Sequence, residues 1–314
     1  MPLSPQLQEV AVIRACCVVA ALALAAVAFT GSRGVAQDGV ATDAELETLS
    51  SRTIAIGTPN TGRIEQLPLE VYVARVLVGE AEPNAPEATM QALAVAIRTY
   101  AVFNVGRHRR EGFDLCDSVH CQVPRAANAQ ARRAALATAG QILTYQGAPA
   151  EIFYSASCGG RSEVGSEVWP HATHPYLKSI KDDVHDDDME WTLELSVADL
   201  QGVLARNGFS GPLKKVEVKS RNKSGRAAVV RLSGMSPDWI AGDRLRTAIG
   251  TTRLRSTAFS VKKDDETIRF TGRGYGHGVG MCVIGAGRRA RRGESMTEIL
   301  KTYYPGLKIE TLES

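Results

Sequence analysis

Apolar residues recur at helical spacing in the first half of the chain. A helix is predicted to start at Pro86, because apolar residues then follow the i, i+3, i+4, i+7 rule of one helix face. Those positions are Met90, Leu93, Ala94, Ile97, Ala101 and Val102. A shorter helix should begin near Pro68, since proline suits the first helical turn. The Ala- and Arg-rich run 126–139 predicts a third helix.

Short apolar runs separated by turn residues replace this pattern in the second half. Residues 141–145 and 150–155 flank Gln146-Gly147-Ala148-Pro149 and predict a hairpin. Further strands are predicted over 213–219, 227–232, 257–263 and 266–271, and further helices over 197–207 and 295–303. Helices first and strands later, without βαβ alternation, predict an α+β fold in which N-terminal helices pack on a mostly antiparallel β core.

The first 36 residues predict export from the cytoplasm. Arg14 precedes an apolar stretch, Cys16 to Phe29, that is short for a bilayer span, and Gly34-Val35-Ala36 suits a signal peptidase. Residues 1–36 are therefore interpreted as a signal peptide or as an uncleaved N-terminal anchor. Only the uncleaved anchor would hold the protein at a membrane, and in both cases its body would be periplasmic or secreted.

Composition adds the domain layout and excludes one class of partner. The 314 residues are 44% hydrophobic and 23% charged, which is ordinary for a globular protein. The net charge of +3 gives no basic surplus for binding nucleic acid. Residues 37–64 are polar and mixed, and they predict a linker or lead-in strand before a single domain over residues 65–308.

Glycine occupies every second position from 272 to 280, alternating with Arg273, Tyr275, His277 and Val279. Glycine allows backbones to approach closely and to adopt positive φ angles, but at an entropic cost. Five such costs in nine residues favour a loop that presents Arg273, Tyr275 and His277 in a crowded site. A flexible turn after a strand is the alternative.

Glu80 and Glu82 lie between the first two predicted helices, in Val78-Gly79-Glu80-Ala81-Glu82-Pro83. A carboxyl group fixed at a helix end against apolar residues can be partly desolvated. Desolvation raises its pKa and suits it to general acid and base catalysis. An exposed acidic loop is the alternative interpretation.

Cys116-Asp-Ser-Val-His-Cys121 is a cluster of metal-type ligands, and His108 precedes it. Two thiolates and an imidazole suit zinc, and His108 and His120 compete for the imidazole position. Adjacent ligands strain a tetrahedral site, which slightly favours His108 over His120. A disulfide between Cys116 and Cys121 is the alternative in an oxidising compartment.

Two further cysteines, Cys158 and Cys282, each adjoin a glycine-containing loop. Cys158 could act as a nucleophile, but no order of Cys and His along the chain identifies a cysteine protease. A disulfide between Cys158 and Cys282 that ties the two loops together is the favoured interpretation.

Several blocks of residues occur in the order of a known family. They are Leu67-Pro-Leu-Glu-Val-Tyr-Val, Val76 to Glu80, Ala92 to Ala101, Cys116 to Gln122, Phe153 to Glu163, Val168-Trp169, Pro175 to Ser179, Gly272 to Met281, Gly285-Ala286 and Ile299 to Gly306. Across residues 65–308 the chain resembles the stage II sporulation protein D (SpoIID) and amidase-enhancer (LytB-type) family. The resemblance implies a SpoIID-like fold.

The resemblance also implies a lytic transglycosylase that cleaves peptidoglycan between N-acetylmuramic acid (MurNAc) and N-acetylglucosamine (GlcNAc), preferring glycan without stem peptides. The family's catalytic acid lies eighteen residues before the Arg of an Arg-Thr-Tyr block, and counting back from Arg98 reaches Glu80. Zinc held by Cys116, Cys121 and a histidine is implied as a structural metal. Ala81-Glu82-Pro83 replaces the family's Met-Pro, which leaves substrate preference open.

This interpretation gives roles to the remaining candidates. Arg98 would pair with a carboxylate or hold the lactyl group of MurNAc, and a purely structural ion pair is the alternative. Tyr275 would stabilise the cation-like transition state, His277 would bind an N-acetyl group or orient the cleft, and Trp169 would stack on a sugar. All of this requires Glu80 to share a sugar-sized groove with the glycine-rich residues 272–281.

Two other functions fit the same residues. The domain could be a non-catalytic binder of cell-wall glycan that activates an N-acetylmuramoyl-L-alanine amidase, in which case Glu80 only accepts a hydrogen bond. A zinc hydrolase that uses Cys116, Cys121 and a histidine is a third interpretation. Product analysis without an amidase separates the first two, and loss of activity on chelation in a folded protein would favour the third.

Overall fold

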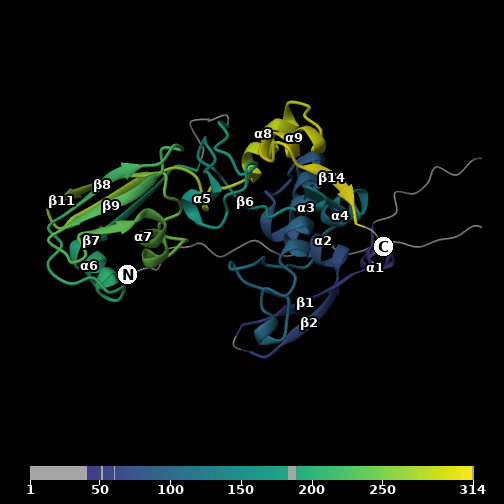
Figure 1. Cartoon of the computed structure of the whole chain (residues 1–314), viewed down its shortest axis with the longest axis horizontal. Helices are drawn as coiled ribbons and strands as arrows, with labels where there is room; N and C mark the ends of the chain where they lie inside the picture. Colours follow the sequence, from purple (N-terminus) through teal and green to yellow (C-terminus); the bar gives the residue numbers. More distant parts are fainter. Residues whose placement is uncertain (1–40, 51, 60, 183–188, 313–314) are drawn as a thin grey trace, which may run out of the picture. The chain divides into compact units, whose positions relative to one another are not determined.

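A computed structural model describes residues 41–312 of the protein, apart from 51, 60 and 183–188. The predicted signal peptide or anchor, residues 1–36, lies outside the described residues. The helices, most of them labelled in Figure 1, are α1 (Asp43–Leu49), α2 (Leu69–Glu80), α3 (Glu87–Phe103), the short 3₁₀ helix η1 (Arg109–Glu111), α4 (Ala129–Ala137), α5 (Gly165–Val168), α6 (Val197–Ala205), α7 (Gly242–Ile249), α8 (Val283–Arg291) and α9 (Met296–Tyr303). In this part of the chain, none of the helices has the length and apolar character that crossing a bilayer requires.

The strands form small sheets that are mostly antiparallel. They are β1 (Thr53–Gly57), β2 (Ile64–Pro68), β3 (Leu115–Cys116), β4 (Gln141–Tyr145), β5 (Ala148–Pro149), β6 (Tyr154–Ser155), β7 (Trp191–Ser196), β8 (Lys215–Arg221), β9 (Ala227–Ser233), β10 (Trp239–Ala241), β11 (Phe259–Asp264), β12 (Thr267–Gly272), β13 (Met281–Cys282) and β14 (Lys308–Thr311). The sheet orders are β2-β1-β3, β10-β9-β8, β11-β12-β7, β13-β6 and β14-β4-β5. β3 pairs with β1 in parallel, and β13 with β6. The predicted α+β class is confirmed.

The three helices predicted from the N-terminal pattern are α2, α3 and α4, which lie side by side in Figure 1. Pro68 and Pro86 hold the N-cap positions of α2 and α3, where a missing N–H breaks no helical hydrogen bond. Leu93 and Ile97 on α3 have no exposed surface. α3 is therefore part of the interior of a first hydrophobic core, and α2 ends at Glu80, which is only partly buried.

This first core extends N-terminal to residue 65. Within residues 37–64, predicted to be a linker or lead-in strand, the chain forms α1 and β1 and begins β2. A capping box between Thr42 and Glu45 starts α1. Leu46 and Ile54 are buried in the same core as α3. The folded region is thus longer than the sequence pattern indicated.

A second hydrophobic core is built from residues 191–270. It takes buried side chains from β7, from β8 and β9, from β11 and β12, and from α6 and α7. The first core takes its residues from both sides of this segment, up to Leu177 and again from Val279 onward. The predicted domain 65–308 therefore contains two cores, and the second is inserted into the chain of the first.

Candidate active site

The glycine-rich residues 272–280, which we call the ribbon, lead from the second core back to the first. The ribbon starts at the last residue of β12 and ends where β13 begins. A backbone bridge pairs Tyr275 with Ser157. Gly274 has a φ of +76°, and a Cβ atom there would lie 2.8 Å from the carbonyl oxygen of Ser157. The crowding that the glycine spacing predicts is present.

Three aromatic rings gather beside the ribbon. Phe153 stacks on Trp169 with 4.3 Å between the ring centroids, and His277 meets Trp169 edge-on at 4.9 Å. Trp169 follows α5, and all three side chains are partly exposed. The cluster therefore offers an apolar aromatic surface next to the ribbon, of a kind that binds flat apolar faces of ligands.

The imidazole nitrogens of His277 are used by the protein backbone. The N–H of Val279 donates to Nδ1 at 3.0 Å, and the ring also hydrogen bonds to the backbone of Tyr154. Burial, followed by the charges of two nearby arginines, lowers the pKa of His277 to about 3, so the ring is neutral. Of the two predicted roles for His277, orienting the cleft fits these contacts, whereas binding an N-acetyl group would need a free nitrogen.

Glu80 is the last residue of α2, and its side chain is partly exposed. Burial raises the pKa of its carboxyl group above the ordinary value. Within the described residues its carboxylate makes no hydrogen bond and no ion pair. A desolvated and unpaired carboxyl group keeps its proton to higher pH and can deliver that proton to a bound ligand.

Tyr154 is close to both Glu80 and the ribbon. It belongs to β6, which pairs with β13 at the end of the ribbon, and its backbone contacts His277. Burial and then the charge of Glu80 raise the pKa of its hydroxyl group. Gln122 donates to that hydroxyl at 2.7 Å and accepts from the hydroxyl of Tyr72 at 2.9 Å. The acid and the ribbon thus share Tyr154 as a neighbour, and hydrogen bonds hold its hydroxyl group in place.

The second carboxylate of the acidic loop points elsewhere. A Cβ atom at Gly287 on α8 would lie 3.3 Å from Oε2 of Glu82, so the Glu82 side chain reaches toward α8. The raised pKa of Glu80 comes from burial. The sequence departure at Ala81-Glu82 therefore adds a charge beside α8, and the pKa of Glu80 does not depend on it.

Arg273 and Tyr275 lie on the ribbon in different surroundings. The exposed guanidinium of Arg273 pairs with Glu190 at 2.8 Å. Tyr275 is partly exposed, and its backbone is fixed by the bridge to Ser157. Of these two candidates, Tyr275 has its backbone held by the bridge to Ser157, whereas the side chain of Arg273 is engaged in an ion pair with Glu190.

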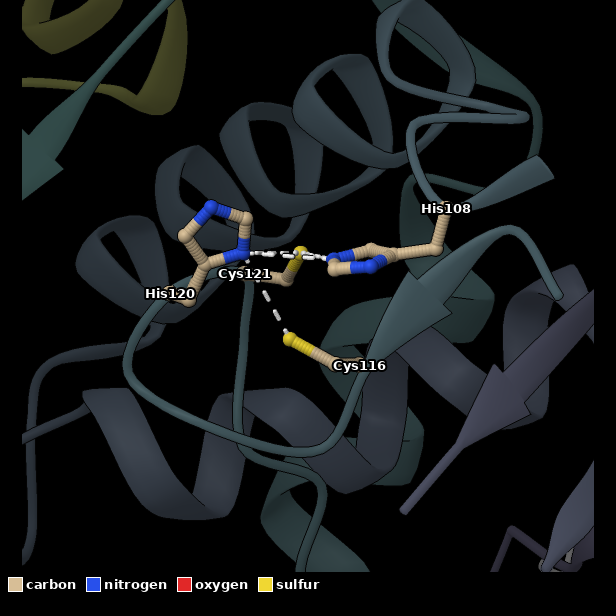
Figure 2. A group of neighbouring side chains, drawn as sticks. All are labelled: His108, Cys116, His120 and Cys121. Atoms are coloured by element: carbon tan, nitrogen blue, oxygen red, sulfur yellow. Dashed lines mark hydrogen bonds between the residues drawn. The ribbon is translucent and has the colours of Figure 1, made fainter. Parts of the chain in front are cut away.

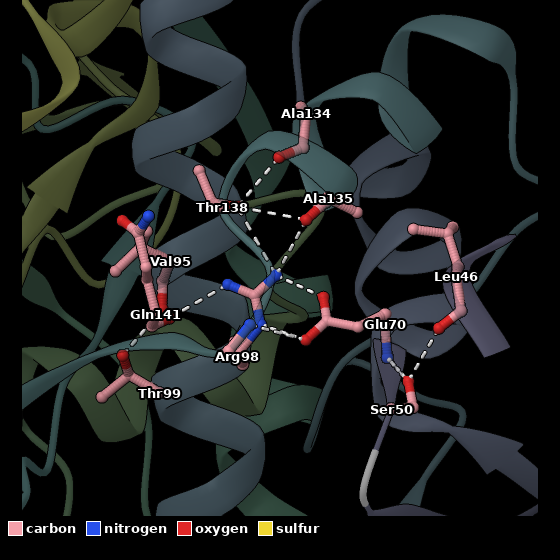
Figure 3. Close-up of polar contacts among 11 residues, drawn as sticks. Leu46, Ser50, Glu70, Val95, Arg98, Thr99, Ala134, Ala135, Thr138 and Gln141 are labelled. Carbon is pink, nitrogen blue, oxygen red and sulfur yellow. Dashed lines mark hydrogen bonds and ion pairs between the residues drawn. The ribbon is translucent and has the colours of Figure 1, made fainter. Parts of the chain in front are cut away.

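Arg98 has no exposed surface, and Figure 3 shows its polar contacts. Its Nε donates to Oε1 of Glu70 at 2.9 Å, its Nη2 donates to Oε2 of the same carboxylate, and its Nη1 donates to the carbonyl of Gln141 at 3.0 Å. Neither side chain of the pair has more than 2% of its surface exposed. The structural ion pair that was the alternative for Arg98 is what the structure contains, and the buried guanidinium exposes no surface to a substrate.

Breaking this pair should destabilise the protein strongly. Arg98→Leu leaves the Glu70 carboxylate buried without its cation and is expected to cost about 3–5 kcal/mol of unfolding free energy. The double variant Arg98→Leu/Glu70→Leu should recover part of that loss. Denaturant unfolding measures both, with Arg269→Ala as a control for the exposed pair with Glu194, where a loss below about 1 kcal/mol is expected. Equal losses at the two pairs would contradict the assignment.

The cysteine and histidine candidates form one cluster (Figure 2). Cys116 lies on β3, His108 precedes η1, and His120 and Cys121 follow on the next loop. One ligand atom from each of the four residues lies within 4.8 Å of all the others. His108 and His120 therefore do not compete for one position, since both rings point into the cluster.

The distances within the cluster fit zinc. Nε2 of His108 lies 3.2 Å from Nδ1 of His120, and the three nitrogen–sulfur separations measured are 3.5, 3.5 and 3.7 Å. A tetrahedron with Zn–N of about 2.0–2.1 Å and Zn–S of about 2.3 Å has edges of about 3.3 Å and about 3.6 Å for these pairs. Glu111 approaches Nδ1 of His108 at 2.5 Å, as carboxylates do behind metal-binding histidines.

Cys158 and Cys282 are brought together, but as two free thiols. The N–H of Cys158 donates to the sulfur of Cys282 at 3.2 Å, and that sulfur also caps α8 by accepting from Gly285. In the β6–β13 pairing, Cys282 stands opposite Ser155. The predicted disulfide is not formed in this structure, although the two sulfur atoms lie within 4.8 Å of each other.

Three residues of the site were not among the predicted candidates: Phe153, Tyr154 and Gln122. All three stand in the ordered blocks quoted above, and Gln122 directly follows a candidate metal ligand. That adjacency was the available signal. β6 has only two residues and shows no periodicity, so the pattern could not reveal that Tyr154 lies near Glu80.

Two family models match parts of the chain. The model of the family described as Stage II sporulation protein matches residues 57–145, and the model of a domain of unknown function (DUF8618) matches residues 183–280. The second range corresponds to the inserted core. The first range contains α2, α3 and the cysteine–histidine cluster.

Three relatives extend the match over most of the chain. An uncharacterised protein of Brachyspira hyodysenteriae is 31% identical over 78% of this chain and 67% of its own length. Stage II sporulation protein D of Bacillus amyloliquefaciens is 29% identical over 80% of this chain and 76% of its own length. The amidase enhancer of Bacillus subtilis is 30% identical over 69% of this chain but only 37% of its own length. The chain belongs to the SpoIID/LytB family.

Proposed function

We propose that this protein is a lytic transglycosylase that cleaves the MurNAc–GlcNAc bonds of peptidoglycan, with a preference for glycan without stem peptides. The observation that carries the proposal is the state of Glu80. Its carboxyl group is desolvated and unpaired within the described residues, and Tyr154 links it to an aromatic, glycine-rich ribbon. A single acid in such a groove suits proton transfer to a glycosidic oxygen.

Glu80 would act first as an acid and then as a base. It protonates the glycosidic oxygen, so that the bond from C1 of MurNAc breaks and GlcNAc leaves as an alcohol. The C6 hydroxyl of the same MurNAc then attacks C1, and the Glu80 carboxylate takes the hydroxyl proton. The product is a 1,6-anhydro ring, no water is consumed, and one carboxyl group replaces the pair that glycoside hydrolysis uses.

The surrounding residues would bind and orient the glycan. Trp169 and Phe153 supply a stacked aromatic platform for a sugar face, and His277 fixes that platform to the ribbon. Tyr275 and the carbonyl groups of the ribbon are electron-rich groups that can stabilise positive charge at C1. These assignments give the ribbon its function in binding and leave the proton transfers to Glu80.

The zinc ion that the four ligands fit would be structural. Two cysteines and two histidines fill a tetrahedral shell and leave no position for a reacting water. When bound, zinc would supply folding energy by joining β3 to the turns on either side of it. The hydrogen bonds from Tyr72 through Gln122 to Tyr154 would then start from a segment that the zinc ion stabilises.

The protein would work outside the cytoplasm, in the periplasm or secreted, in contact with peptidoglycan strands. Membrane attachment would follow only if the N-terminal segment stays uncleaved. The likeness to an amidase enhancer favours a second candidate, in which the same groove binds glycan without cleaving it and an N-acetylmuramoyl-L-alanine amidase is the partner.

A digestion without any amidase tests the proposal. Purified mature protein is incubated with peptide-free glycan strands, and the products are identified by mass spectrometry. The expected result is the appearance of 1,6-anhydro-MurNAc ends. Binding to the strands with no new ends would support the amidase-enhancer function, and hydrolytic reducing ends would contradict the transglycosylase mechanism.

A further inference from the structure

A polar groove of about 620 Å³ lies beside α2. Its walls include residues of α1, β1, β2, α2 and α4 and of the loop 123–127. We call it the arginine groove because four arginines line it: Arg63, Arg75, Arg125 and Arg132.

The carboxylates of the arginine groove are already engaged. The contacts are Arg75 with Glu65 at 2.8 Å, Arg132 with Asp43 at 2.6 Å, and the Thr58 hydroxyl with Asp117 at 2.7 Å. Arg63 and Arg125 are exposed, and their guanidinium groups have no partner among the described residues. The groove therefore keeps two cations available for an anionic ligand.

One residue that lines the arginine groove, Arg125, packs against α2 close to the proposed acid. Arg75 and Gly79 lie on one face of α2, four residues apart. A Cβ atom at Gly79 would lie 3.5 Å from Cγ of Arg125, and the N–H of Arg125 donates to the carbonyl of Arg75 at 2.9 Å. Gly79 directly precedes Glu80, so the stem of Arg125 is fixed one residue away from the carboxyl group that would transfer the proton.

We infer that the arginine groove, through Arg125, binds the free lactyl carboxylate of a MurNAc residue in the glycan strand. The inference rests on the proposed function and names the group by which this site selects its substrate. MurNAc carries a carboxylate only where the stem peptide has been removed, since the peptide is attached there as an amide. A guanidinium binds a carboxylate through two parallel charged hydrogen bonds, which a neutral amide cannot offer.

Binding measurements on an uncleaved ligand test the inference. A peptide-free MurNAc–GlcNAc tetrasaccharide is titrated calorimetrically into the Glu80→Gln protein at fixed salt, beside the same tetrasaccharide with its lactyl carboxylates converted to methylamides. Adding Arg125→Ala is expected to weaken binding of the free acid about tenfold or more. The methylamide should bind both proteins equally and weakly. Arg125→Lys, which keeps the charge but loses the planar pair of donors, should fall between.

Arg133→Ala is the matched control, because Arg133 is an exposed arginine of α4 that does not line the groove. Equal binding of the free acid and the methylamide by the Glu80→Gln protein would overturn the inference, and so would an equal loss of both ligands on Arg125→Ala. Carboxylate-dependent binding by a protein that releases no anhydro ends would support the inference while contradicting the proposed catalysis.

Discussion

Glu80→Gln is expected to lower the release of 1,6-anhydro ends from peptide-free glycan by about 10²–10⁴-fold, the usual contribution of a positioned acid or base. Glutamine fills the same space but cannot donate an acidic proton. Because Glu82 points toward α8, Glu82→Gln is the matched control and should keep most of the activity. The measurement is the rate of anhydro-end formation by mass spectrometry. An unchanged rate in Glu80→Gln would remove Glu80 from the mechanism.

Glu80→Gln should leave the thermal stability of the protein at neutral pH unchanged or raise it. The pKa of Glu80 is raised in the folded protein, so its ionised form is less stable there than in the unfolded chain. The protonated group's contribution to stability is lost as pH rises through the folded-state pKa. Glu80→Gln should therefore unfold at an equal or higher temperature than the native protein at neutral pH, and thermal scans at two pH values check this. A lower midpoint at neutral pH would mean that the carboxylate has a stabilising partner.

The pH profile of activity follows from the same shift. Protonation of the leaving oxygen needs the acid form of Glu80, and a raised pKa extends that form to higher pH. Activity should fall on the alkaline side with a midpoint above the ordinary pKa of a glutamic acid.

Loss of zinc is expected to produce the largest change in stability. The native protein should carry one zinc ion per chain, and Cys121→Ser should lower the zinc content and reduce the unfolding temperature by at least about 10 °C. That shift corresponds to about 5 kcal/mol at about 2 °C per kcal/mol for a protein of this size. Metal analysis and thermal unfolding measure the two effects.

His171→Ala is the control, because among the described residues His171 belongs to neither group of possible metal ligands and should leave the zinc content unchanged. If the metal is structural, its loss should not change the activity of the molecules that remain folded. Below their unfolding temperatures, the zinc-poor and native proteins should cleave glycan at similar rates per folded molecule. Complete loss of cleavage in a zinc-free protein that remains folded would favour the zinc-hydrolase interpretation instead.

The regular part of the fold could be predicted from the sequence because its periodicity is strong. α3 carries apolar residues on every turn, and prolines mark the starts of α2 and α3, so these helices were placed within a few residues. The elements that were missed are short or depend on distant partners. α1 and β1 bury only a few side chains, among them Leu46 and Ile54, within a polar stretch, and no local pattern separates such a stretch from a linker.

In the candidate site, too, the sequence predicted the features that depend on local spacing and missed those that depend on distant partners. The spacing indicated a metal cluster at residues 108–121. It favoured one histidine over the other, because adjacent ligands strain a tetrahedral site. In the structure, the loop allows His120 and Cys121 both to point into the cluster. The burial of Arg98 depends on its ion pair with Glu70, twenty-eight residues earlier. The hydrophobic periodicity of the sequence contains no information on that pairing. The pairing of β6 with β13, which places Tyr154 opposite Met281, also joins distant parts of the chain.

The ribbon is the exit of the chain from the inserted core, and this has an evolutionary consequence. Trp191, in that core, donates to the carbonyl of Gly274 at 3.0 Å, and Arg226 donates to the carbonyl of Cys158 at 2.7 Å. The inserted module thus shapes the wall against which a sugar would rest, although it contributes no proton donor. Under the proposed function, a lineage that changes this module would alter its binding of glycan while Glu80 on α2 stays the same.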